Sequence, residues 1–362
     1  MLLAVLVLLA GCHNAPQKAQ TTGKPPGSWA TPGAEPDGEP TATPTPAGPE
    51  PISAAAVRRA RKLPLEQRVG QLFVVGFKGV DLSAEVFAQL RAHGWGGIVV
   101  GPSNAFDLAG VGLFAGEARV IAQQANRVVP LVASFDDARP PRLGSDQREG
   151  RIRAADAAAD AKAQGVTLTT APFIDVGLGA DPDLISRVAP VAVKAWLDGG
   201  VAPAPGHFPG QGTVTQDPLA GPANVGLTEQ DLRGRDLKPF RTALKEAPAV
   251  TVSSATFTAY DPVTPAALTP AIVEGLLRRD LRFGGVAMTD DLSSVTAATG
   301  GTPGDAAVAA LKAGIDLVYV PDARQVDVVY SAVLKAVRSG RIPAGRVREA
   351  AARVLALKAV LR

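Results

Sequence analysis

The sequence predicts an α/β fold, a single (β/α)8 TIM barrel over residues 53–362. Eight short apolar runs follow one another in this region, and each is separated from the next by a stretch compatible with a helix. The runs are continuously apolar, as expected of parallel strands that are buried on both faces. Eight such units in about 310 residues fit a TIM barrel, which typically needs about 250. An open doubly wound sheet is the alternative.

The predicted elements alternate along the chain. The strands are expected at Gln71–Phe77, Gly97–Val100, Leu131–Phe135, Thr167–Ala171, Val201–Ala204, Ala249–Ser253, Gly285–Thr289 and Leu317–Val320. The helices are expected at Leu82–His93, Glu117–Arg127, Asp156–Gln164, Leu184–Leu197, Glu229–Glu246, Pro270–Arg279, Asp305–Lys312, Val326–Ser339 and Pro343–Leu361.

Residues 1–12 form an apolar run that ends Leu9-Ala10-Gly11-Cys12. The run is too short to span a bilayer, which needs about 20 apolar residues. It resembles a lipoprotein signal peptide whose lipobox cysteine, Cys12, carries the lipid after cleavage. The buried start of a cytosolic domain is the alternative.

Residues 13–52 hold 10 of the chain's 31 prolines and almost no large apolar side chains. Such a segment cannot bury enough surface to offset the entropy of ordering, which predicts a disordered tether. We therefore expect a secreted lipoprotein on the extracytoplasmic side of the cell envelope, anchored to the membrane through Cys12.

The formal net charge is +3, with acidic and basic residues interspersed, so no nucleic-acid partner is expected. Cys12 is the only cysteine, which excludes a disulfide within the chain. No His, Cys and carboxylate residues recur at metal-ligand spacing, so neither a metal nor an organic cofactor is expected. We expect a monomer.

Polar residues follow most of the predicted strands, at the end where TIM barrels carry their active sites. Several acids and one histidine would therefore meet at one mouth. They are Asp136 and Asp137 after the third strand, Asp175 after the fourth, His207 after the fifth, Ser253 and Ser254 at the sixth, Asp290 and Asp291 after the seventh, and Asp322 after the eighth.

Gly206-His-Phe-Pro-Gly-Gln-Gly212 resembles the Lys-His-Phe-Pro-Gly-His-Gly segment of glycoside hydrolase family 3, in its branch of single-domain β-N-acetylhexosaminidases. The resemblance covers about residues 60–362. Further similar stretches occur in the family's order at Leu65–Leu72, Gly96–Val100, Pro130–Asp136, Gly165–Val176 and Gly284–Leu292.

The resemblance implies a retaining mechanism, in which a carboxylate attacks the anomeric carbon and water then hydrolyses the glycosyl-enzyme. The nucleophile would be Asp290, although an Asp in this position could instead cap the next helix. Asp136 and His207 would contact the sugar, and His207 could alternatively serve only in packing. Asp175 would be a structural hydrogen-bonding residue. Arg142, or alternatively Arg139, would replace the family's sugar-binding arginine.

The sequence departs from the family pattern at positions that the resemblance implies take part in binding the sugar or in catalysis. Gly206 occupies the position of the family's lysine, and Ser254 that of the histidine in the strand-six motif. The family's Asp-Ser-His acid/base triplet is Asp217-Pro218-Leu219 here, so the acid/base histidine is absent. Asp217 could act alone if apolar neighbours raised its pKa.

Two functions remain open. The first is a surface-anchored hydrolase of N-acetylglucosamine-containing glycans, such as peptidoglycan fragments, with weakened catalysis because general acid catalysis typically contributes 10²–10⁴-fold. The second is a non-catalytic relative that binds a glycan or a protein.

Overall fold

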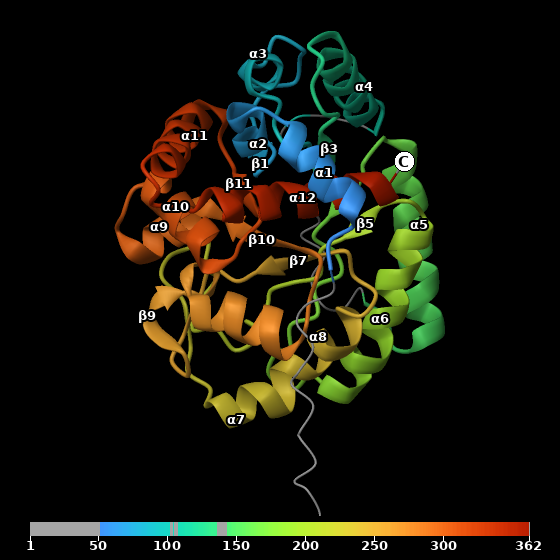
Figure 1. The fold of residues 1–362 in the computed structure, drawn as a ribbon. Coiled ribbons are helices and arrows are strands. Elements are labelled where there is room, and N and C mark those ends of the chain that lie inside the picture. The colour runs from blue at the N-terminus through green and yellow to red at the C-terminus, as the bar shows by residue number, and fades with distance from the viewer. Residues whose placement is uncertain (1–50, 102–103, 105–107, 136–142, 362) are drawn as a thin grey trace, which may run out of the picture. The chain divides into compact units, whose positions relative to one another are not determined.

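The computed structural model describes residues 51–101, 104, 108–135 and 143–361. Within them, eight parallel strands form one sheet in the order β5-β4-β3-β2-β1-β11-β10-β7, surrounded by helices (Figure 1). The TIM barrel is confirmed, and each strand overlaps a predicted run. The strands are β1 Phe73–Gly76, β2 Gly97–Val99, β3 Leu131–Ser134, β4 Leu168–Thr169, β5 Ala202–Pro203, β7 Ala249–Val252, β10 Val286–Asp291 and β11 Leu317–Val320.

Main-chain hydrogen bonds between β7 and the segment after β5 join the two edges of the sheet. The Thr251 N–H donates to the Pro205 carbonyl at 3.1 Å, and the Phe208 N–H donates to the Thr251 carbonyl at 2.8 Å. The segment that carries the His-Phe-Pro-Gly motif is therefore part of the barrel wall. This position holds its side chains more rigidly than a surface loop would.

The helices cover the outside of the barrel and its amino ends. Most lie within a few residues of their expected positions. They are α1 Ala54–Lys62, α2 Leu65–Gly70, α3 Glu85–His93, α4 Leu108–Gln124, α5 Gln147–Ala163, α6 Pro182–Asp198, α7 Glu229–Asp231, η2 Leu232–Asp236, α8 Leu237–Ala243, η3 Ala266–Leu268, η4 Ala271–Asp280, α9 Leu292–Thr299, α10 Pro303–Ala313, α11 Ala323–Arg338 and α12 Ala344–Val360. No helix among these described residues is long and apolar enough to cross a membrane.

Alternate strand residues point to opposite sides of the barrel wall. Val74 joins a small interior cluster to which every barrel strand contributes, whereas its neighbours Phe73 and Val75 pack in the larger layer under the helices. Val354 and Leu357 of α12 belong to the interior cluster. Helix α12 therefore closes the amino ends of the strands, and the opposite end is left for the site.

Three features were not expected from the sequence. A small sheet forms from β6 Asn224–Val225, β8 Thr256–Phe257 and β9 Asp261–Pro265. The helix expected at Glu229–Glu246 is broken into α7, a π-helical turn η2 and α8, and α1, α2 and α9 are additional short helices. Two-residue strands and single helical turns are too short to show the periodicity on which such predictions depend.

Candidate active site at the carboxyl ends of the strands

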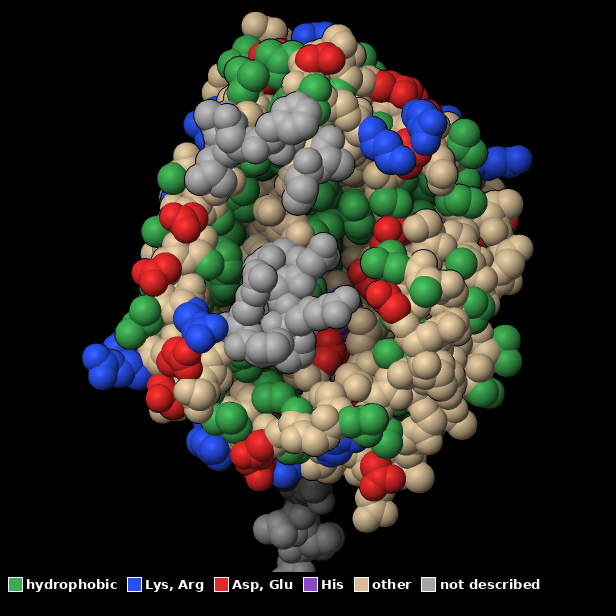
Figure 2. All heavy atoms as spheres, turned by 180° about the vertical axis from the view of Figure 1, so that it is seen from behind, with side chains coloured by type: hydrophobic (Ala, Val, Ile, Leu, Met, Phe, Trp, Pro, Cys, Tyr) green, Lys and Arg blue, Asp and Glu red, His purple; other side chains and the backbone are tan. Residues whose placement is uncertain are grey.

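The carboxyl ends of the barrel strands open on the face opposite α12. Figure 1 shows α12 in front of the strands, and Figure 2 looks onto the molecule from behind, where side chains line a hollow and acidic residues gather around it. His207, Asp217 and Asp290 all contribute to this face, because Asp290 lies at the carboxyl end of β10 and the other two follow β5. The two carboxylates lie close enough to His207 to raise its pKa.

Asp175, after β4, holds His207, after β5. Its Oδ2 accepts hydrogen bonds from the His207 backbone N–H at 3.0 Å and from Nδ1 at 2.8 Å, and its Oδ1 accepts one from the Gln211 N–H at 2.7 Å. The Phe173 ring stacks on the imidazole with centroids 4.8 Å apart. Since Nδ1 is taken by the carboxylate, Nε2 is the nitrogen left to meet a ligand. Asp175 has the geometry of a positioning residue.

The His207 imidazole is largely buried, with 16% of its side chain exposed. Burial favours the neutral ring, but the charge and hydrogen bond of Asp175, with the charges of Asp290 and Asp217, outweigh it and raise the pKa of His207 to about 9. The ring is therefore an imidazolium at neutral pH. It presents a charged donor, which forms shorter and stronger hydrogen bonds than a neutral one.

Asp290 and Asp291 end β10 and have different partners. The Asp291 side chain accepts from the Ser293 N–H at 2.7 Å and so caps α9. Asp290 accepts a hydrogen bond from the Ser254 hydroxyl at 3.1 Å, and the β10–β11 register shifts between Met288 and Asp291. The capping role that an Asp at this point could have is thus taken by Asp291, which leaves the Asp290 carboxylate available.

Asp217 lies on the long segment after β5. Its carboxylate accepts from the Leu219 N–H at 2.9 Å, and both residues are exposed, Leu219 by 66%. The apolar Pro218-Leu219 pair therefore does not bury the Asp217 carboxyl, which was the condition for it to act as a lone acid. Leu219 presents a hydrocarbon side chain to solvent, so it has no proton to donate.

Gly206, immediately before His207, is closely packed. A Cβ at this residue would lie 3.0 Å from the Thr251 Cβ on the neighbouring strand β7. A side chain at this position would require Thr251 to give by a few tenths of an ångström.

Asp236 was not anticipated by the sequence analysis. It is fully buried at the end of η2, and neither of its carboxyl oxygens has a hydrogen-bond partner among the described residues. Burial raises the pKa of Asp236 to about 6, with Arg235 opposing and Asp175 adding to the rise. A Cβ on Gly210 would lie 2.7 Å from the Asp236 Cβ. The backbone of the segment that follows His207 therefore packs directly against Asp236. In the sequence, Asp236 is spaced four residues from both Leu232 and Phe240, on the apolar face of a helix. An acid at such a position was the signal that could have revealed it.

Asp136, Arg142 and Cys12 lie outside the described residues, so their predicted roles stay predictions. In the part of the chain that the structure describes, no three His, Cys, Asp or Glu residues come together as a metal site would require.

A family match decides the classification: residues 64–357 match the N-terminal domain of glycosyl hydrolase family 3. The chain belongs to glycosyl hydrolase family 3. This family 3 chain is 28% identical over 393 residues to the β-hexosaminidase LpqI of Mycobacterium tuberculosis, covering 99% of this chain and 96% of that protein. It is also 28% identical over 278 residues to a β-hexosaminidase of Idiomarina loihiensis, covering 68% of this chain and 82% of that protein.

Solved structures agree with the family assignment. A family 3 β-N-acetylglucosaminidase from Paenibacillus sp. strain FPU-7 superposes with a TM-score of 0.77 at 28% identity, covering 83% of this chain. The family 3 chain spans only 63% of that protein, which is less than two thirds. M. tuberculosis LpqI superposes with a TM-score of 0.72 at 26% identity, covering 85% of this chain and 97% of that one.

Proposed function

We propose that this chain is a retaining glycoside hydrolase that acts on N-acetylglucosamine-containing glycans of the peptidoglycan type, with weakened catalysis. Membership of glycosyl hydrolase family 3 and the relatives named β-hexosaminidase support this substrate class. The single observation on which the proposal depends is the Asp290 carboxylate at the end of β10, which accepts from Ser254 and does not cap α9.

In the proposed reaction, an Asp290 oxygen attacks the anomeric carbon and the glycosidic oxygen departs with the rest of the glycan. Water then hydrolyses the glycosyl-enzyme and releases Asp290. Ser254 donates to one oxygen of that carboxylate and so orients it. The His207 imidazolium, held by Asp175, would donate through Nε2 to a sugar oxygen. Asp136 and Arg142 would add sugar contacts.

The weakness is proposed to lie in protonation of the leaving oxygen. Leu219 has no proton to give, and Asp217 is an exposed carboxylate engaged with a backbone N–H. A sugar alcohol is a poor leaving group without a proton, whereas nitrophenolate leaves as a stable anion. The geometry therefore favours activated aryl glycosides over natural disaccharides.

A second candidate is a non-catalytic glycan-binding protein. Gly206 and Leu219 favour it, because neither can supply the charge or the proton of the lysine and the histidine that the resemblance implies at these positions. Asp175 and His207 would then serve recognition only.

We further propose that the protein is a lipoprotein anchored through Cys12 on the extracytoplasmic side of the cell envelope. The support is the Leu-Ala-Gly-Cys sequence and the proline-rich segment that follows it.

The proposal is tested by comparing hydrolysis of nitrophenyl N-acetyl-β-glucosaminide and of N,N′-diacetylchitobiose. We expect the parent to cleave the aryl substrate and to cleave the disaccharide slowly or not at all. Leu219→His, which rebuilds the family's dyad with Asp217, should raise disaccharide cleavage by about 10²-fold or more, the usual contribution of a general acid.

Leu178→His is the matched control, since Leu178 is another exposed leucine, on the segment after β4. It should leave disaccharide cleavage unchanged. Comparable cleavage of both substrates by the parent would mean that another residue is the acid. If neither substrate is cleaved by any variant while chitobiose still raises the melting temperature, the binding function replaces the enzymatic one.

A further inference from the structure

A second cavity, of about 760 Å³, opens on the side of the barrel opposite the mouth. Pro248 and Gly285, which line it, come immediately before β7 and β10. Active sites of this fold lie at the carboxyl ends of the strands, so this cavity is separate from the candidate active site. Its volume is within the range of small-molecule pockets, about 300–1,000 Å³.

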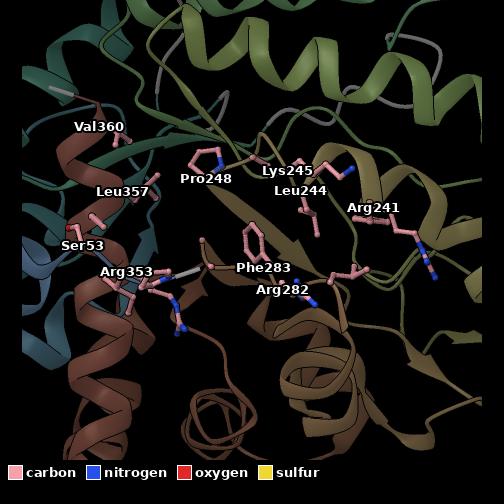
Figure 3. Close-up of a pocket in the computed structure, with 18 of the residues that line it drawn as sticks. Ser53, Arg241, Leu244, Lys245, Pro248, Arg282, Phe283, Arg353, Leu357 and Val360 are labelled. Carbon is pink, nitrogen blue, oxygen red and sulfur yellow. The ribbon is translucent and has the colours of Figure 1, made fainter. Parts of the chain in front are cut away.

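Part of the cavity wall is apolar. Figure 3 shows the Phe283 ring between Leu244, next to α8, and Leu357 on α12. Phe283 and Leu357 are each only 3% exposed, so they form a firm floor. Val360 at the end of α12 is 65% exposed and forms part of the rim. An aliphatic or aromatic group could pack against Val360 and the small exposed parts of Phe283 and Leu357.

The charges at the rim are predominantly positive. Arg241, Lys245 and Arg282 are exposed lining residues for which the described chain shows no ion pair (Figure 3). The acidic lining residue, Asp280, is already paired with Arg233 at 2.9 Å, outside the lining. The cavity therefore offers cations without a matching internal anion, which favours a negatively charged ligand.

One further observation concerns the backbone of the lining. Arg353 also lines the cavity, but its Nη atoms bind Asp316 and Glu349 and its Nε is buried, so its charge is already paired. Arg282 has a φ of 55°, a left-handed backbone that costs energy in a residue other than glycine and is often kept at functional sites.

We propose that this cavity is a binding site for an organic phosphate that carries an apolar group. The apolar group packs on Phe283 and Leu357, and the phosphate lies among Arg241, Lys245 and Arg282. The site depends on neither Asp290 nor His207, so it stands whether or not the barrel mouth turns over glycosides.

The test is a calorimetric titration of the full chain carrying Cys12→Ser with hexyl phosphate, hexanol and inorganic phosphate. We expect saturable binding of one hexyl phosphate. Hexanol and inorganic phosphate should bind at least about tenfold more weakly, because the first lacks the phosphate and the second lacks the apolar group. Equal affinity for hexanol would reveal an apolar cleft without anion selectivity, and equal affinity for inorganic phosphate would reveal surface charge alone. Either result, or no saturable binding, overturns the proposal.

Two variants with matched controls assign the binding to the cavity. Val360→Glu places a carboxylate at the rim and should weaken hexyl phosphate binding at least about tenfold. Val328→Glu, on an equally exposed valine of α11, should bind as the parent does.

Arg241→Gln/Lys245→Gln should weaken hexyl phosphate binding to a similar extent, whereas Arg91→Gln/Arg119→Gln, which removes two exposed cations elsewhere, should not. All four variants alter exposed side chains, so folding should be retained. Equal binding by a variant and its control would place the ligand outside this cavity.

Discussion

At the end of β10 two carboxylates follow each other in the chain, and only the second reaches the amino end of α9. A helix cap needs backbone N–H groups, and Asp291 has them. A nucleophile needs a carboxylate that is oriented by a hydrogen bond but still has an oxygen available to attack. Asp290, whose Oδ2 accepts from Ser254, meets that need. The different partners of Asp290 and Asp291 therefore separate the nucleophile from the helix cap, two roles that the sequence alone left open for Asp290.

Asp290→Ala should lower hydrolysis of nitrophenyl N-acetyl-β-glucosaminide by several orders of magnitude, because no covalent intermediate can form. Asp291→Ala should instead lower the free energy of unfolding by about 1 kcal/mol, the usual value of a helix cap. Steady-state kinetics and urea unfolding of both variants check this. Residual activity of Asp290→Ala within about tenfold of the parent, about 1.4 kcal/mol, would contradict the assignment of the nucleophile.

The His207–Asp175 pair should make the free energy of unfolding decrease as the pH rises above 6.5. The pKa of His207 is raised from 6.5 to about 9 on folding, so the folded state holds the proton more tightly than the unfolded state. The stabilisation is fully present below pH 6.5 and is lost as pH rises through 9. Urea unfolding of the parent and of His207→Gln should therefore differ most near pH 6 and least above pH 9. A constant difference across this range would contradict the imidazolium.

At the scale of elements, a buried ionic cluster joins η4, β11 and α12 at the amino end of the barrel. Asp316, immediately before β11, is fully buried and binds Arg278 at 2.5 Å, Arg346 at 2.6 Å and Arg353 at 3.3 Å. Burial alone would raise the pKa of Asp316, but the three guanidinium groups hold it below its ordinary value. The cluster therefore links α12 and η4 to the start of β11.

Asp316→Asn should lower the free energy of unfolding by about 3–5 kcal/mol, because it leaves buried guanidinium groups without their counter-charge. Asp327→Asn is the matched control: Asp327 is 51% exposed and pairs with His93, and exposed pairs contribute about 0–1 kcal/mol. Urea denaturation measures both. A loss for Asp316→Asn as small as that of the control would show that the cluster adds no stability.

The barrel strands were predictable because burial on both faces demands continuous apolar runs, and the sequence shows eight of them. The small sheet and the break at η2 were not, because two-residue strands and single helical turns are too short to show a periodicity. The same division holds for the site. Strand ends placed His207 and Asp290 at the mouth, but the bond from Ser254 and the burial of Asp236 depend on three-dimensional packing. Asp217 shows that apolar neighbours in sequence do not ensure burial.

At the scale of the whole molecule, anchoring and folding should be separable. Cys12→Ser should move the protein from the membrane fraction to the soluble fraction and leave the melting temperature of the barrel unchanged, since the residue lies outside the matched region 64–357. Fractionation and calorimetry test this together. Retention of the variant in the membrane fraction would exclude Cys12 as the anchor.

The pairing of the first elements of the barrel with the last has a consequence for biosynthesis. Strand β1 bonds to β11, and α1 packs on α12, whose arginines also complete the Asp316 cluster. Contacts between such distant parts of a chain form late and slow the folding of a domain. On the ribosome the barrel cannot close until β11 and α12 have emerged, so a chain that stops before β11 leaves one edge of β1 unpaired, and such edges favour aggregation.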